Sequence, residues 1–238
     1  MLPKARLPDL TAMFGITGLV LCGCTEVIVK DEERHGFTEG ASHSILDSRI
    51  EFLEDKLRDY PKRDDYEYGI AAIYFEKEDY RESARHLRRA ISLSPDNSKY
   101  HYQLGRVYLK MHEVDLAETS FQAATRQTQG GRYSGFHQAL GFVKGMKKEH
   151  AAAEVEFERA IEAEPDNAES YYFLAAVCDL QGKRDKAVRN FREYLVRGGQ
   201  VFRTNTIFFL EKLGVVVDRE ALERAERSVH PLGPARKG

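Results

Sequence analysis

Carboxylates between Glu149 and Glu164 form the densest group of side chains that could do acid–base chemistry. They alternate with apolar Val155, Phe157 and Ile161, a pattern typical of a helix with one solvated face. We therefore interpret the group as a solvated helix surface and predict no catalytic residue from it. Its members are Glu154, Glu156, Glu158, Glu162 and Glu164.

The histidines and arginines give no clearer sign of a reactive site. No histidine has a second histidine four residues along the chain, so we interpret five of them as solvated surface residues: His86, His101, His112, His137 and His150. A basic group could reach a phosphate or an acidic partner, but Glu78, Glu82 and their neighbours can pair with it along one helix. This group consists of Arg81, Arg85, Arg88 and Arg89.

Motifs of the common catalytic and metal sites are absent from the sequence. It contains no phosphate-binding loop, no nucleophile elbow and no paired cysteines at metal-ligand spacing. We predict that the protein is not an enzyme and has no metal or dissociable cofactor.

The first residues carry a different chemical signal, which concerns a cysteine near the amino end. Lys4 and Arg6 precede an apolar run from Leu10 to Leu21, and Leu21-Cys22-Gly23-Cys24 follows. The run is shorter than the roughly 20 apolar residues that a membrane-spanning helix needs. These residues resemble the signal peptide and lipobox of bacterial lipoproteins.

The resemblance implies that residues 1–23 are a signal peptide and that Cys24 becomes the first mature residue and carries a covalent lipid. Cys22 fits less well, because bulky Leu21 precedes it where the signal peptidase expects a small side chain. Two alternatives remain open, an ordinary secretory signal with an incidental cysteine and an uncleaved anchor. Residues 24–43 have charges, glycines and little periodicity, and we predict a flexible tether.

Composition narrows the class of partner. The chain has 238 residues, 31% of them charged, and a formal net charge of −2. Neither sign of charge dominates, so composition does not predict nucleic-acid binding. With Cys22 removed and Cys24 modified, Cys178 would have no disulfide partner, and packing alone would hold the fold.

Internal repetition is the strongest signal for the fold. Ile70, Leu104, Leu140 and Leu174 are separated by 34, 36 and 34 positions. Two further sets keep the same intervals: Leu87, Phe121, Phe157 and Phe191, and Ala90, Ala124, Ala160 and Tyr194. A period of this length predicts a solenoid of stacked units.

The repeated unit resembles the tetratricopeptide repeat. The second unit carries the pattern most fully, with Leu104-Gly105-x-x-Tyr108, then Ala117-x-x-x-Phe121 and Ala124. Lys144, Cys178 and Ser83 depart from the usual residues in the other units. The family buries the position of Cys178, so the resemblance implies a buried, unreactive thiol there. The resemblance implies an all-α, right-handed superhelix of about four helix pairs, with repeats at residues 64–97, 98–131, 134–167 and 168–199.

Additional helices should cover both ends of the stack, so that the whole folded part spans residues 44–229. We predict an N-terminal cap helix at 44–60, which would bury Ile45, Ile50, Leu53 and Leu57. C-terminal cap helices are predicted within 202–229, the first from Phe202 to Leu213 with Gly214 as its stop, the second from Asp218 to Val229. Residues 230–238 are predicted to form a disordered tail.

The resemblance also implies a concave groove lined by the first helix of each pair. Groove positions fall on Tyr68, Phe75, Lys99, Tyr102, Arg106, Lys110, Phe142 and Tyr172. One aromatic ring per repeat would suit a bound peptide segment. The alternative is that these rings pack against neighbouring helices. The Lys and Asn clamp by which some tetratricopeptide domains hold chaperone C-termini is not reproduced here.

We therefore predict a lipid-anchored scaffold of the cell envelope that binds an envelope protein or peptide in its groove. Thr25 replaces the Asp that would favour inner-membrane retention, so we expect the outer membrane, facing the periplasm. Such a protein resembles pilotins of type IV pilus secretins and adaptors of envelope proteases or cell-wall hydrolases. An enzyme or small-ligand-binding solenoid is the rival class, and self-association through Phe202, Phe208 and Phe209 is a further possibility.

Overall fold

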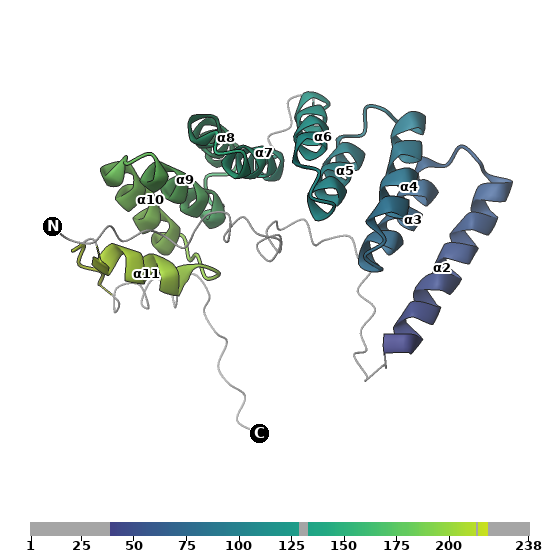
Figure 1. Cartoon of the computed structure of the whole chain (residues 1–238), viewed down its shortest axis with the longest axis horizontal. Coiled ribbons are helices and arrows are strands. Elements are labelled where there is room, and N and C mark those ends of the chain that lie inside the picture. Colours follow the sequence, from purple (N-terminus) through teal and green to yellow (C-terminus); the bar gives the residue numbers. More distant parts are fainter. Residues whose placement is uncertain (1–38, 129–132, 213, 219–238) are drawn as a thin grey trace, which may run out of the picture. The chain divides into compact units, whose positions relative to one another are not determined.

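The computed structural model describes residues 39–128, 133–212 and 214–218. All regular elements in these ranges are α-helices, so the predicted all-α fold is confirmed (Figure 1). None of the described helices is long and apolar enough to span a membrane. The described helices form two compact units, and the boundary between them in the sequence lies between residues 131 and 132.

The N-terminal unit contains a long helix followed by two helix pairs. Its elements are α2 (Glu39–Asp59), α3 (Asp64–Glu76), α4 (Tyr80–Leu93), α5 (Ser98–Lys110) and α6 (Val114–Arg126). The C-terminal unit contains two further pairs and a shorter final helix. Its elements are α7 (Ser134–Met146), α8 (His150–Ala163), α9 (Ala168–Leu180), α10 (Arg184–Val196) and α11 (Arg203–Lys212). The paired helices α3–α4, α5–α6, α7–α8 and α9–α10 lie inside the ranges predicted for the four repeats.

Each pair turns at a residue with left-handed backbone, two positions after its first helix. These residues are Glu78, His112, Lys148 and Gly182, with φ of 59°, 62°, 62° and 74°. In each turn the next N–H donates to a carbonyl of the preceding helix, for example from Glu113 to Tyr108 at 2.9 Å. This bond satisfies a carbonyl that the helix end would leave without a partner.

Asparagine side chains begin two of the first helices. Asn97 accepts a hydrogen bond from the N–H of Lys99, and Asn167 accepts one from Ser170. Such N-caps typically stabilise a helix by about 1 kcal/mol. Asn97 therefore caps α5, and Asn167 caps α9.

Close approach of the helices in the second and third pairs depends on glycine. A Cβ built on Gly105 would lie 2.5 Å from the ring of Phe121, and one on Gly141 would lie 2.9 Å from Phe157. Both rings are fully buried, as is Phe191. In these two pairs, the small residue on the first helix lets a ring of the second helix pack against its backbone.

The end helices agree with the sequence in most respects. Ile50 of α2 packs with Ile70 and Ile73, and Leu53 and Leu57 join the cluster. The prediction that Ile45 is buried is wrong, because this residue is 50% exposed. Leu46 takes its place in the cluster, since it lies on the same face of α2 as Ile50 and Leu53.

Helix boundaries differ slightly from those predicted. Helix α2 begins at Glu39 instead of residue 44, so its first turn includes residues assigned to the tether. Helix α11 covers Arg203–Lys212, and Gly214 follows with φ of 73°. The signal peptide, Cys24, the rest of the tether, most of the second C-terminal cap helix and the tail lie outside the described residues.

Candidate binding surface on helices α3 and α5

Helices α3 and α5 bring together three of the predicted groove residues. The guanidinium of Arg106 lies over the ring of Phe75, 5.2 Å from its centroid. Its Nη1 donates to Oε1 of Gln103 at 2.9 Å, and Nε2 of Gln103 donates to the hydroxyl of Tyr68 at 3.3 Å. Tyr68, Phe75 and Arg106 are thus joined across two adjacent first helices by Gln103.

Gln103 was not among the predicted binding residues, although its spacing could have indicated it. Lys99, Gln103, Arg106 and Lys110 follow one another at intervals of four, three and four residues. This spacing places them on one face of α5. Lys99 is exposed, and Arg106 and Lys110 are half-buried. The α5 face is therefore a stripe of three cations and one amide.

Tyrosine stacking holds the α3 side of this surface. The rings of Tyr68 and Tyr100 stack with centroids 5.1 Å apart. The buried Tyr100 donates from its hydroxyl to Oδ2 of Asp64 at 2.9 Å. Hydrogen bonds from Ser94 and Tyr100 lower the pKa of Asp64, so this carboxylate stays charged and fixes the Tyr100 ring. The stacked ring of Tyr100 consequently holds Tyr68 in a defined position.

Three other predicted rings are not accessible, so the expectation of one groove ring in every repeat is wrong. Tyr102 and Phe142 are each 8% exposed and Tyr172 is 1% exposed. Tyr102 packs against Phe121, with centroids 5.5 Å apart. Phe142 meets the edge of Phe173. The alternative, that these rings pack against neighbouring helices, describes them correctly.

Tyr172 is covered by the segment that leads into α11. The ring of Phe202 stacks on it at a centroid distance of 4.1 Å and an interplanar angle of 11°. The backbone N–H of Phe202 donates to the hydroxyl of Tyr194 at 2.6 Å. Within the C-terminal unit, the cap therefore fills the place where Tyr172 would meet a ligand.

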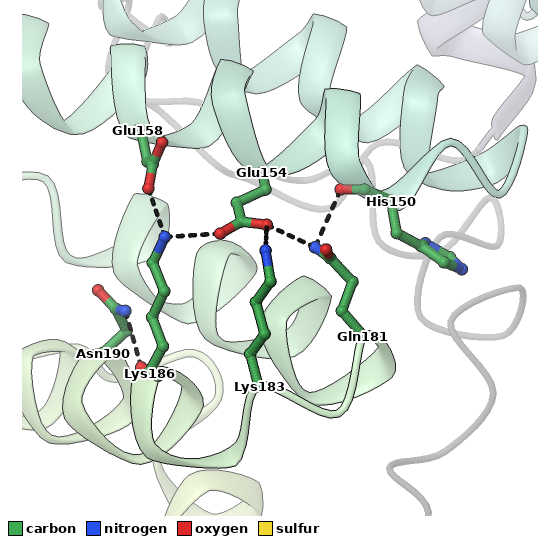
Figure 2. A network of polar contacts seen from close by, with 7 residues as sticks. All are labelled: His150, Glu154, Glu158, Gln181, Lys183, Lys186 and Asn190. Carbon is green, nitrogen blue, oxygen red and sulfur yellow. Dashed lines mark hydrogen bonds and ion pairs between the residues drawn. The ribbon is translucent and has the colours of Figure 1, made fainter.

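Two of the five carboxylates in the α8 group are buried, contrary to our interpretation, while Glu162 and Glu164 are exposed. Glu154 and Glu156 are each 7% exposed. Figure 2 shows Glu154 at the centre of a polar network, where Nζ of Lys183 and Nζ of Lys186 each lie 2.6 Å from its carboxylate. Nε2 of Gln181 donates to the same carboxylate at 2.7 Å. These groups come from the next repeat, which the pattern of α8 alone does not reveal.

The network determines the charge of Glu154. Burial raises the pKa of this carboxyl, but hydrogen bonds from Lys183, Lys186 and Gln181 outweigh burial and lower the pKa to about 2. Lys186 also bonds Glu158 at 2.5 Å. The network joins α8 to α10 and its preceding turn, so it links consecutive repeats.

Two histidines and the basic group also require correction or refinement. His86 is buried and the His137 side chain is 26% exposed, and each contacts a buried glutamate on the paired helix. Arg85 pairs with Glu82, as predicted. Arg88 instead donates to the hydroxyl of Tyr108. The described residues contain no cluster of His, Cys, Asp or Glu suited to holding a metal ion.

Cys178 is a core residue, as predicted. Its side chain is fully buried and unpaired by disulfide. Burial raises the pKa of its thiol to about 11. Because the thiolate is the reactive form, this thiol is unreactive at neutral pH.

The fold and two sequence segments define the class of protein. Residues 71–111 match a TPR repeat family and residues 149–201 match a tetratricopeptide repeat family. The chain therefore carries tetratricopeptide repeats. No curated protein matches it.

Solved structures confirm the tetratricopeptide-type solenoid fold. The crystal structure of MamA is 20% identical, with a TM-score of 0.61 over 68% of this chain and 96% of MamA. PilW, described as a widely conserved type IV pilus biogenesis factor, is 18% identical, with a TM-score of 0.61 over 84% of this chain and 91% of its own. YrrB, described as a TPR protein with an unusual peptide-binding site, is 20% identical, with a TM-score of 0.58 over 68% of this chain and 82% of its own.

Proposed function

We propose that this protein is a protein–protein interaction scaffold whose α3–α5 surface binds a segment of a partner protein. One observation carries the proposal: Tyr68, Phe75 and Arg106 form a connected aromatic and cationic surface on adjacent first helices. Aromatic and arginine side chains are the usual anchors of protein interfaces. The peptide-binding site named for YrrB, a neighbour of the same fold, agrees with this use.

The proposal extends to the place where the scaffold works. The basic start and the Leu21-Cys22-Gly23-Cys24 sequence support a lipid anchor on Cys24. Acyl chains give membrane affinity in proportion to their buried methylene groups, about 0.8 kcal/mol each. We place the protein in the cell envelope, at the outer membrane and facing the periplasm, because Thr25 follows Cys24.

Within the envelope, we propose a role in assembling or targeting a machine such as a pilus or secretion system. The neighbour PilW, which is described as a pilus biogenesis factor, supports this choice and covers the largest share of the chain among the three structures above. The alternative client is a periplasmic hydrolase or protease. Self-association through α11 has less support, because Phe209 is buried and Phe202 packs on Tyr172, which leaves Phe208 exposed.

Membrane fractionation tests the anchor. Wild-type protein should be found in the membrane fraction, and Cys24→Ser should leave an uncleaved precursor or a soluble form. Cys22→Ser is the matched control and should behave like wild type. A cleaved Cys24→Ser protein that stays in the membrane would contradict the lipid anchor.

Crosslinking in cells tests the binding surface. Ala72 is exposed between Tyr68 and Phe75 on α3, so a photo-crosslinker placed there should capture a partner. Tyr68→Ala and Phe75→Ala should each reduce the crosslinked product strongly. Phe208→Ala removes an exposed ring from the other unit and should have no effect. An unchanged product in both α3 variants would reject this surface.

A further inference from the structure

The guanidinium of Arg106 is held in place by neutral groups. The Phe75 ring supports its face, and Gln103 accepts a hydrogen bond from Nη1. Tyr68 holds Gln103 in turn. No carboxylate of the described residues lies within ion-pair distance of Arg106. The positive charge is therefore fixed in position without being neutralised.

Such an arginine is prepared to bind an anion. A guanidinium has five N–H donors, and the bond to Gln103 uses one of them. The remaining donors can bind a carboxylate through two parallel hydrogen bonds. The support from Phe75 and Gln103 reduces the side-chain entropy that would be lost on binding.

Building on the proposed function, we propose that the partner segment bound at the α3–α5 surface is acidic, and that Arg106 binds one of its carboxylates. Lys99 and Lys110 lie on the same face of α5, seven residues before Arg106 and four residues after it. With a helical rise of 1.5 Å per residue, they are about 10 Å and about 6 Å from Arg106 along the helix axis. The separation of about 6 Å between Arg106 and Lys110 matches two carboxylates two residues apart, which lie on the same side of an extended segment.

The acids of the surface do not neutralise this stripe. Asp64 accepts a hydrogen bond from Tyr100, and Asp65 forms a bidentate pair with Arg63 at 2.7 and 2.6 Å. Glu76 is exposed in the last turn of α3 and is the remaining acid on that helix face. The cations of α5 therefore outnumber the acids that are free to oppose them.

A protein segment fits better than a nucleic acid. The chain as a whole has a net charge of −2, so it would repel a polyanion away from this stripe. Tyr68 and Phe75 lie beside the cations and can receive apolar side chains located between the acids of the segment. An acidic segment with interspersed apolar residues is complementary to both features.

Peptide binding to the purified full-length chain tests the proposal. The probe is a fluorescein-labelled peptide with Glu at the spacing above and Leu between, compared with the same peptide carrying Gln for Glu. Fluorescence anisotropy should show binding of the Glu peptide and about tenfold or more weaker binding of the Gln peptide. Arg106→Gln should weaken binding of the Glu peptide by a similar factor.

Arg81→Gln is the matched control. It removes the same charge from an exposed position on α4 and should leave the affinity unchanged. The proposal is overturned if the Glu peptide does not bind, if the Gln peptide binds equally well, or if Arg81→Gln weakens binding as much as Arg106→Gln. Equal binding of a single-stranded oligonucleotide would also overturn it.

The crosslink at Ala72 separates this proposal from the proposed function. If Tyr68→Ala and Phe75→Ala abolish the crosslink and Arg106→Gln does not, the interaction surface stands and the acidic partner is rejected. If none of the three variants changes the crosslink, the interaction surface itself is rejected. If all three abolish it, both proposals are supported.

Discussion

The Nδ1 atom of His86 on α4 lies 2.6 Å from Oε2 of Glu67 on α3, and their side chains are 3% and 9% exposed. The third helix pair contains the same contact with the residue types exchanged. There His137 is on the first helix, α7, and its Nδ1 lies 2.8 Å from Oε2 of Glu156 on α8. Both contacts join residues that are 19 positions apart.

An arginine accompanies each buried carboxylate. Arg89 lies 3.8 Å from Glu67, and Arg159 lies 2.8 Å from Glu156. In each hairpin, one member of the pair lies on the second helix, His86 in the first hairpin and Glu156 in the third. The arginine follows that residue by three positions. The hairpin therefore accepts the histidine–glutamate pair in either orientation, with the arginine as a common third member.

Exchanging the pair in the first hairpin tests this equivalence. Glu67→His alone would place two histidines in contact, and His86→Glu alone would place two carboxylates in contact. Removing one partner of a buried hydrogen bond typically costs about 1–3 kcal/mol of unfolding free energy. The double variant restores the pair in the orientation found in the third hairpin, so it should recover most of that loss. Urea unfolding of the four proteins measures the coupling.

The outcome depends on whether the double variant is more stable than both single variants. A matched control applies the same test to the exposed pair of Asp55 and Arg58, where exchange should change little because surface ion pairs contribute about 0–1 kcal/mol. A double variant no more stable than the worse single variant would contradict the equivalence of the two orientations.

Buried polar side chains are the part of this fold that the sequence did not reveal. The apolar spacing correctly located the helix pairs. Few structures other than stacked helix pairs would place residues such as Gly105 and Phe121 at a period of that length. Glu154 and His86, however, look like surface residues when each helix is considered alone. The partner of each lies on another helix, and an amphipathic pattern contains no information about it. One signal was available in the sequence: a Glu and a His lie 19 residues apart in both the first and the third repeat, with the two residue types exchanged.

The groove residues were predicted with mixed success for a related reason. Repeat register correctly brought Tyr68, Phe75 and Arg106 to one surface. Whether a ring on that register is exposed depends on what lies beside it, and for Tyr172 this is Phe202, which lies outside the repeats. The position of a residue in the repeat therefore predicts which surface its side chain faces, and the neighbouring element decides whether that side chain is exposed.

Glycine at position 105 should be essential for the second helix pair. The methyl group of Gly105→Ala would lie 2.5 Å from the Phe121 ring, which is fully buried and cannot move freely. Such overpacking typically lowers the free energy of unfolding by about 1–3 kcal/mol. Gly69→Ala is the matched control, since its methyl group would meet the end of the Leu53 side chain at 3.2 Å.

Thermal unfolding followed by circular dichroism measures this difference. Gly69→Ala should melt close to wild type, because the helix propensity gained by alanine, about 1 kcal/mol, offsets a small adjustment of Leu53. Gly105→Ala should melt clearly lower, and Gly105→Leu lower still. Equal melting of Gly105→Ala and wild type would show that the pairing of α5 with α6 is wrong.

Glu154 should make stability depend on pH below neutrality. Its pKa in the folded protein is about 2, against an ordinary value of 4.5. A lowered pKa means that the folded state favours the charged form, so the stabilisation is complete above about pH 4.5 and is lost as the pH falls towards 2. The difference corresponds to about 3 kcal/mol at most. Glu154→Gln should lose this stabilisation at neutral pH and lack the dependence in that window.

Urea unfolding at several pH values between neutrality and about 2 measures the effect. Glu162→Gln is the control, because Glu162 is exposed on the same helix and has no ion pair with a described residue. It should follow the wild-type curve. If Glu154→Gln also follows that curve, Lys183 and Lys186 do not hold the carboxylate in solution.

Tyr194 should hold the C-terminal cap on the last repeat. Its hydroxyl accepts the backbone N–H of Phe202 at 2.6 Å, and Phe202 in turn stacks on Tyr172. Tyr194→Phe keeps the buried ring but leaves that N–H without its acceptor, at a typical cost of about 1–3 kcal/mol. Because the lost bond is local, its loss should lower the free energy of opening α11 before it affects the opening of the other helices.

Hydrogen exchange in the native state distinguishes local from global destabilisation. In Tyr194→Phe, amides of residues 203–212 should exchange faster, while those of α7 and α8 keep their wild-type protection. Tyr133→Phe is the control, because Tyr133 is 55% exposed and its loss of a hydroxyl should change neither set. Unchanged exchange in α11 would show that stacking of Phe202 on Tyr172 is sufficient to hold the cap without the hydrogen bond.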